Sequence, residues 1–83
     1  MKALYFASVR ERIGLAEEDL APPPAVKTIA DLIDWLRGRG DGYGEAFAEA
    51  RSIRAALDRS HARHDAALGD AREVAFFPPM TGG

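Results

Sequence analysis

Thr28-Ile29-Ala30-Asp31-Leu32-Ile33-Asp34-Trp35-Leu36 is the stretch that decides the fold, because it carries the clearest helical signal in the chain. Its large aliphatic residues follow the i, i+3, i+4, i+7 spacing of one helix face. Thr28 is a good N-cap, and Asp31 stands three residues later, as in a capping box. Trp35 widens the apolar stripe, and Gly38 and Gly40 end the helix. The stretch predicts one main helix with its stripe in the core.

Short apolar segments on both sides of this helix predict strands. They are expected at residues 1–9, 15–21, 52–58, 61–64 and 73–77. The second would pair back on the first as a hairpin. Turns are expected at residues 10–14, 59–60 and 68–70, a flexible link at 41–44, and a short helix at 45–51 with Phe47 as its anchor. The pattern predicts the α+β class, a small mixed sheet packed on one main helix.

The composition narrows the function classes. A chain of 83 residues forms one domain that buries about 60 to 65% of its unfolded surface, which favours a carrier, a binding module or a subunit over an enzyme working alone. With 11 basic and 13 acidic residues the net charge is −2, which argues against nucleic acid and against a polybasic membrane anchor. The absence of cysteine excludes disulfides and Cys-based sites and points to the cytoplasm. The sequence contains no apolar run of membrane-spanning length.

The outer strands are apolar on both faces. In the first strand Leu4 and Phe6 alternate with Ala3 and Tyr5, and in the last strand Phe77 alternates with Phe76. A sheet covered by one helix should have one polar face. Two readings are open: residues 43–50 or a loop cover the second face, or Phe6 and Phe77 belong to an exposed patch that docks a partner.

The C-terminus reads Phe77-Pro78-Pro79-Met80-Thr81-Gly82-Gly83. The six residues after the last strand would reach about 20 Å if extended, and the prolines stiffen their root. The glycines would let the tip enter a narrow channel. The carboxylate of Gly83 is ionised at neutral pH and needs activation before a nucleophile can attack it. We therefore expect a domain at residues 1–77 and a flexible tail at 78–83, although a frayed terminus is the simpler reading of a bare Gly-Gly ending.

The ending Ala75-Phe76-Phe77-Pro78-Pro79-Met80-Thr81-Gly82-Gly83 closely resembles that of the molybdopterin synthase small subunits, the MoaD-like sulfur carriers. The opening Leu4-Tyr5-Phe6-Ala7-Ser8-Val9-Arg10-Glu11 resembles their first strand, and Gly14 the turn after it. The resemblance implies a ubiquitin-like β-grasp fold. It also departs from the family, which usually carries an apolar residue where His61 stands.

The resemblance further implies a reaction cycle. An activating enzyme of the ubiquitin-activating type would use ATP to adenylate Gly83, a sulfur donor protein would convert it to a thiocarboxylate, and this would donate sulfur to cyclic pyranopterin monophosphate. The large synthase subunit would hold the catalytic groups in a heterotetramer, and this chain would be a non-catalytic carrier with no stably bound cofactor. The residues expected to contact partners are Phe6, Arg10, His61, Phe77, Pro78, Pro79, Met80, Thr81 and Gly82.

Other functions stay open at this point. The same tail chemistry would serve a sulfur carrier for another pathway, such as that of the thiamine thiazole. A ubiquitin-like modifier would instead join Gly83 to lysines on target proteins, and a plain interaction module would make no use of its tail. His61 and His64 do not predict a metal site, since residues three apart on a strand point to opposite faces.

Overall fold

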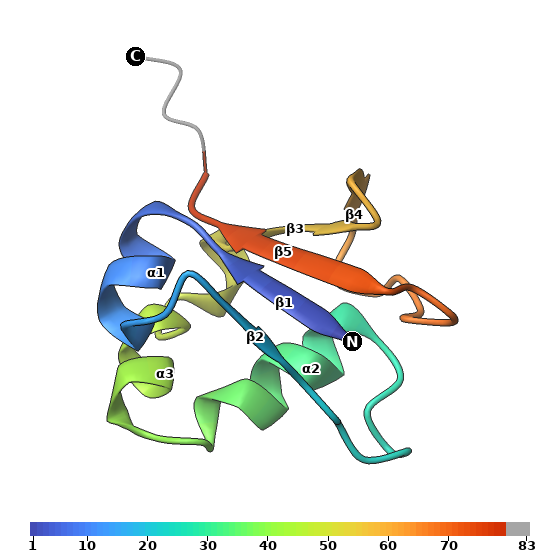
Figure 1. Cartoon of the computed structure of the whole chain (residues 1–83), viewed down its shortest axis with the longest axis horizontal. Helices are drawn as coiled ribbons and strands as arrows, with labels where there is room; N and C mark the ends of the chain where they lie inside the picture. Colours follow the sequence, from blue (N-terminus) through green and yellow to red (C-terminus); the bar gives the residue numbers. More distant parts are fainter. Residues whose placement is uncertain (80–83) are drawn as a thin grey trace.

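The computed structural model describes residues 1–79 of the 83-residue chain (Figure 1). The helices and strands follow in the order β1 (Lys2–Tyr5), α1 (Ala7–Ile13), β2 (Glu17–Asp19), α2 (Ile29–Arg37), α3 (Asp41–Ala46), the 3-10 turn η1 (Ala50–Ser52), β3 (Arg54–Leu57), β4 (Ser60–Ala62) and β5 (Glu73–Phe77). The five strands form one sheet in the order β2-β1-β5-β3-β4. The predicted α+β class and mixed sheet are confirmed.

The two end strands of the chain lie side by side at the centre of the sheet. β1 and β5 run parallel, with Tyr5 opposite Phe76. The other pairs are antiparallel: β2 on β1, β3 on β5 and β4 on β3. The predicted hairpin of the first two strands is therefore present, although a helix is inserted between them. This order brings the N-terminal strand next to the strand that leads into the C-terminal tail.

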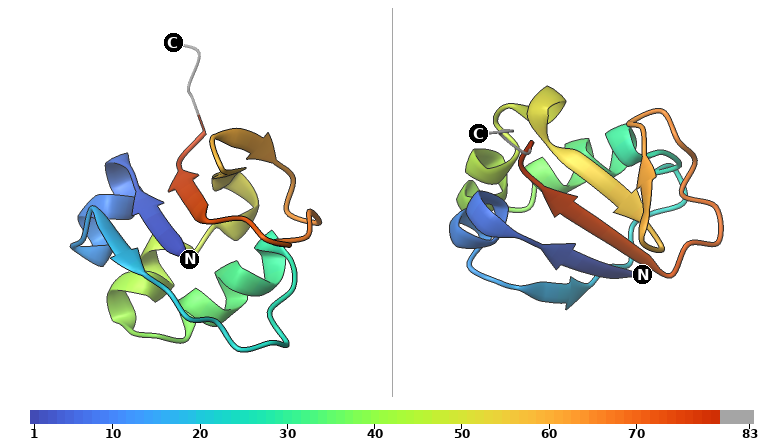
Figure 2. Two further views of the ribbon diagram at one scale, coloured as in Figure 1. Left: turned by 45° about the vertical axis from the view of Figure 1, so that its right-hand side comes forward. Right: turned by 90° about the horizontal axis from the view of Figure 1, so that it is seen from above.

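The helices of residues 1–79 lie on one side of the sheet or at its end, and no other segment of that part of the chain covers the opposite face (Figures 1 and 2). The core forms on the covered side. The largest fully buried side chains are those of Tyr5, Phe47, Phe76, Ile29, Leu32, Ile33, Leu36, Val9 and Val74. Phe47 packs edge-on against Phe76, with ring centroids 5.2 Å apart. The single core is consistent with the small size of the chain.

Helix α2 is the helix that the sequence predicts. The hydroxyl of Thr28 accepts a hydrogen bond from the Asp31 amide at 3.1 Å, and the Asp31 carboxylate accepts one from the Thr28 amide at 3.2 Å. This completes the predicted capping box. The four aliphatic residues of the stripe are all buried, and Trp35 is half-buried against them. The helix supplies much of the layer under the sheet.

Helix α1 is new with respect to the sequence prediction, and the short helix predicted at residues 45–51 lies earlier, as α3 at Asp41–Ala46. Residues 6–9 do not continue the first strand, and residues 10–14 are not a turn. Instead the chain leaves the sheet at Phe6, Ala7 takes a positive φ of 52°, and α1 runs to a left-handed C-cap at Gly14. Likewise, residues 41–44 are not a flexible link but most of α3. A Cβ on Gly42 would lie 2.5 Å from the Arg12 carbonyl oxygen, so glycine is needed where α3 meets α1.

Residues 43–50 do not cover the second face of the sheet. They lie on the same side as α2, and Phe47 enters the core there. The first of the two readings of the apolar outer strands is therefore wrong for this segment. Phe6 is 45% exposed and Phe77 is half-buried. Because one layer of helices covers only one face, the apolar side chains of the other face stay in contact with solvent.

A polar cluster ties the edge strand β2 to the covered side. The Glu18 carboxylate accepts hydrogen bonds from the hydroxyls of Tyr5 at 2.8 Å and Tyr43 at 2.6 Å. It also forms an ion pair with Arg39 at 3.2 Å. Burial acts to raise the pKa of Glu18, but the hydrogen bonds from Tyr43 and Tyr5 and the charge of Arg39 outweigh it, so the pKa lies below its ordinary value. Glu18 is therefore held as a carboxylate.

Candidate functional site

The candidate site is the uncovered face of the sheet together with the end of β5. Because alternate side chains of a strand point to opposite faces, the register fixes the members of this face. They are Leu4 and Lys2 of β1, Ala75 and Phe77 of β5, Arg54 and Ala56 of β3, His61 of β4, and Glu17 and Asp19 of β2. Phe6 continues the Leu4 side of β1. The centre of this face is thus apolar, at Leu4, Ala75 and Phe77, and charged residues lie around it, including Glu73 of β5, which is opposite Lys2 in the register.

Three of the predicted partner-contacting residues meet on this face. The backbone amide of Phe6 donates to the Phe76 carbonyl at 3.1 Å, which puts Phe6 beside Phe77 at the same end of the two central strands. The ring of His61 stands edge-on to that of Phe77, with centroids 5.6 Å apart. An imidazole can cover an aromatic ring with its apolar edge while its nitrogens stay in water. His61 therefore extends the apolar strip to the sheet edge.

Arg10 lies outside the strip. It is exposed on α1, one helical turn after Phe6, so it stands at the margin of the face rather than on it. Its backbone amide donates to the Phe6 carbonyl at 3.4 Å.

The described part of the tail begins at this same corner. Pro78 is half-buried and Pro79 is exposed. Both line a pocket of about 320 Å³ together with residues of α1, α3 and η1, among them Ser8, Arg12 and Ser52. The tail therefore leaves the domain from the end of β5, next to Phe77. Met80, Thr81, Gly82 and Gly83 lie outside the described residues.

The two histidines take separate partners. His61 lies against Phe77, whereas Nε2 of His64 donates to the Ile53 carbonyl at 2.7 Å. Within residues 1–79 no group of three or more His, Cys, Asp or Glu side chains is placed to hold a metal ion. None of the helices in that part of the chain has the length and apolar character of a transmembrane span.

The sequence prediction missed Arg54, which is directly opposite Phe77 in the β3–β5 register. The signal was present as alternation in residues 53–57, where Ile53, Ala55 and Leu57 occupy one face and Arg54 and Ala56 the other. Its position became visible only once β3 was paired with β5.

Comparison with known proteins agrees with this geometry. A model of the ThiS family matches residues 3–83. The chain belongs to the ThiS family. The molybdopterin synthase sulfur carrier subunit of Escherichia coli is 34% identical over 83 residues, covering 100% of this chain and 99% of the relative.

Solved structures of similar chains confirm the β-grasp fold. A putative molybdopterin converting factor, subunit 1, from Pyrococcus furiosus superposes with a TM-score of 0.72 at 28% identity, over 94% of each chain. SAMP1 from Haloferax volcanii superposes with a TM-score of 0.71 at 23% identity, over 100% of this chain and 98% of that one, a likeness that concerns the fold alone. The resemblance of the chain's two ends to molybdopterin synthase small subunits, and the β-grasp fold that it implied, are thus confirmed.

Proposed function

We propose that this ThiS family protein is the sulfur carrier subunit of a molybdopterin synthase, and not an enzyme by itself. The observation that carries the proposal is the continuity between the uncovered apolar face and the tail. Phe77 is the last strand residue on this face, and Pro78 is the first residue of the tail. A partner docked on Phe6, Phe77 and His61 would therefore receive the C-terminus at its own surface. The Escherichia coli relative at 34% identity is a molybdopterin synthase sulfur carrier subunit, which supports the proposal.

The chemistry begins at the Gly83 carboxylate, which is ionised at neutral pH and is a poor electrophile. In the proposed cycle an activating enzyme transfers AMP from ATP to this carboxylate and releases pyrophosphate. A donor protein then delivers sulfur at the oxidation level of sulfide, and this sulfur attacks the acyl carbon and displaces AMP, which leaves a thiocarboxylate. The thiocarboxylate sulfur attacks a carbon of cyclic pyranopterin monophosphate and displaces an oxygen substituent from it. Water then cleaves the acyl–sulfur bond, which returns the Gly83 carboxylate and leaves the sulfur on the substrate. Two such transfers supply the two sulfurs of the dithiolene.

The division of labour follows from the size of the domain. The core of this chain is a single layer of side chains, and a deep catalytic cleft would remove much of it. We therefore place the catalytic groups on the large synthase subunit, in a heterotetramer of two carriers and two large subunits. Because the adenylation consumes ATP, we place the cycle in the cytoplasm.

The first experiment tests the chemistry of the tail. The full chain is incubated with an activating enzyme, ATP and a sulfur donor, and its intact mass is measured. The expected result is exchange of one oxygen for one sulfur, lost when Gly83 is deleted. No exchange with a competent activating enzyme would reject the proposal. A ladder of covalent conjugates on a denaturing gel would point instead to a protein modifier.

The second experiment tests the docking face. Phe77→Ala should weaken binding to the large subunit by about tenfold or more, since buried aromatic anchors dominate interface energies. Arg37→Gln is the matched control, because Arg37 lies on α2 beneath the covered face. Equal affinities of the Phe77→Ala and Arg37→Gln variants would remove the face from the proposal while leaving the tail chemistry intact.

A further inference from the structure

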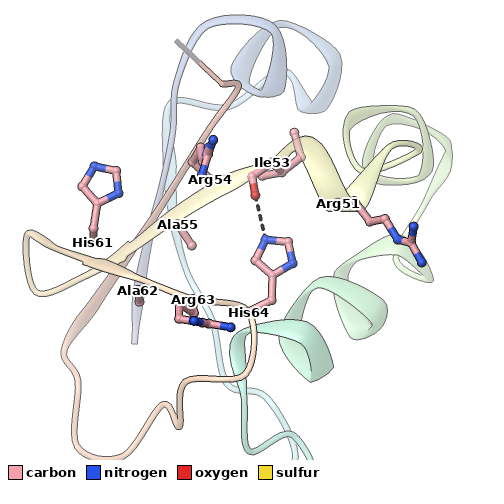
Figure 3. A pocket seen from close by; sticks show the side chains of 8 residues that line it. All are labelled: Arg51, Ile53, Arg54, Ala55, His61, Ala62, Arg63 and His64. Atoms are coloured by element: carbon pink, nitrogen blue, oxygen red, sulfur yellow. Dashed lines mark hydrogen bonds between the residues drawn. The ribbon is translucent and has the colours of Figure 1, made fainter.

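A basic notch lies at the β3–β4 edge of the sheet, and none of its three arginines was singled out by the sequence analysis. It has a volume of about 300 Å³, and its polar lining is Arg51, Arg54, Arg63, His61 and His64. Figure 3 shows the His64–Ile53 hydrogen bond at its centre, with the three arginines placed around it. In a chain whose net charge is −2, this concentration of positive charge is local.

The notch exists because the β3–β4 ladder ends early. The last paired residues are Ala55 and Ala62. If the antiparallel ladder continued, the next hydrogen-bonded backbone pair would be Ile53 and His64. Here the His64 imidazole makes the bond to the Ile53 carbonyl instead, while the His64 carbonyl accepts from the Ala30 amide of α2 at 2.8 Å. The two strands separate, and arginines from both sides border the gap.

The positive charges of the notch are available to a ligand. Within residues 1–79 neither Arg51 nor Arg54 forms an ion pair. Arg63 lies 3.6 Å from Asp65, but the two side chains are 89% and 78% exposed, so water screens this pair and a better acceptor can replace it. All three guanidinium groups are solvated and can bind carboxylates in a bidentate manner.

The notch is continuous with the docking face. Arg54 is opposite Phe77 across β3 and β5, and His61 borders both the notch and the apolar strip. The far edge of the same face has the opposite charge, because β2 carries Glu17 and Asp19 there. The face is therefore apolar around Leu4, Ala75 and Phe77 and basic along β3–β4, and it carries two carboxylates along β2, where Glu17 pairs with Lys2 of β1.

We propose that the notch of Arg51, Arg54 and Arg63 binds an acidic segment of the protein that docks on the uncovered face. This contact would determine the orientation in which the partner docks. The proposal rests on the proposed function for the identity of that partner, the large synthase subunit. An extended acidic surface suits the notch better than a free small anion, because the arginines are solvated and spread around an open rim. Charges at an interface rim act mainly on the association rate and on partner orientation.

The test is the association rate of the full-length chain with the large subunit, measured by stopped flow at low and at high salt. The triple variant Arg51→Gln, Arg54→Gln, Arg63→Gln should associate about tenfold more slowly at low salt. The difference should shrink at high salt, where exposed charges are screened. Arg37→Gln is again the matched control and should associate like the unaltered chain. Thermal unfolding of each variant checks that the fold is retained.

The outcomes separate this inference from the proposed function. If the unaltered chain binds the large subunit and the triple variant associates equally fast, the notch does not guide docking, although the docking face stands. If the unaltered chain does not bind at all, both proposals fail. Titration with inorganic phosphate, followed through the arginine side-chain NMR signals, examines the competing ligand. Tight phosphate binding together with an unchanged association rate would overturn the proposal in favour of a small-anion site.

Discussion

The two faces of the sheet are built from neighbouring residues and do different work. On β5, Val74 and Phe76 are completely buried, whereas Ala75 and Phe77 are only half-buried on the other face. Adjacent phenylalanines thus belong to different surfaces, one inside the core and one free to meet a partner. The apolar residues of such a strand therefore need two explanations: one set forms the core, and the other set lies on the face where we propose that a partner docks.

The first prediction tests this difference between the two faces by truncating each phenylalanine to alanine. Phe76→Ala should lower the free energy of unfolding by about 3–5 kcal/mol, because it leaves a cavity against Phe47 and Tyr5. Phe77→Ala should cost less, about 1–2 kcal/mol, since its ring is only partly buried and lies on the uncovered face. Urea unfolding measures both values. Should Phe76→Ala be unfolded without denaturant, Phe76→Leu provides the milder comparison, and equal costs at the two positions would contradict the assignment of faces.

The second prediction concerns the packing of the covered side. Gly42→Ala should destabilise by about 1–3 kcal/mol, because the new methyl group meets the backbone carbonyl of Arg12, which cannot move aside cheaply. Gly44→Ala in the same helix is the control, since the nearest atom to its Cβ, the Arg37 carbonyl oxygen, is 3.8 Å away. That change should be neutral or stabilising by up to about 1 kcal/mol through helix propensity. Thermal denaturation measures the pair, and a harmless Gly42→Ala would show that α1 and α3 are not closely packed.

The third prediction compares two neighbouring glutamates of β2. Glu18→Gln should cost about 1.5–3 kcal/mol, since it weakens the charged acceptor of two tyrosine hydroxyls and of Arg39. Glu17→Gln should cost less than about 0.5 kcal/mol, because its ion pair with Lys2 is about half exposed on the open face. Chemical denaturation at neutral pH gives both numbers.

The pH dependence of the unfolding free energy tests the role of Glu18. The pKa of Glu18 is lower in the folded chain than its ordinary value of 4.5. Its contribution to stability is therefore complete above that value and is lost as the pH falls through the folded pKa. The stability gap between the unaltered chain and Glu18→Gln should narrow on acidification. A gap that stays constant down to pH values well below 4.5 would contradict the depressed pKa.

A small effect on stability is also expected at Phe6, on the open face. Phe6 is the N-cap of α1 and makes no side-chain capping bond. Phe6→Ser removes a ring that is already 45% exposed and supplies a capping oxygen. The stability lost with the ring and the stability gained from the N-cap should therefore cancel to within about 1 kcal/mol. Binding to the large subunit should weaken nonetheless. Thermal unfolding and a binding titration on one preparation measure both effects, and a large loss of stability would place Phe6 in the core instead.

The sequence by itself determined the elements whose signals are local. The stripe and capping box of α2, the strand Glu73–Phe77 with its following prolines, and the division of Leu4, Phe6 and Phe77 from Tyr5 and Phe76 all follow from periodicity over a few residues. The chain's two ends also sufficed for the family. These predictions hold because each depends on neighbours in sequence.

Only the tertiary structure decided the features that depend on distant contacts. Helix α1 starts at the positive φ of Ala7, and α3 forms in a glycine-rich segment because α1 packs against it. The position of Arg54 beside Phe77, the separation of β3 from β4 around His64, and the joining of Glu18 to Tyr43 all need pairs of residues far apart in the chain. Propensity is a weak guide where such contacts supply most of the stabilising free energy.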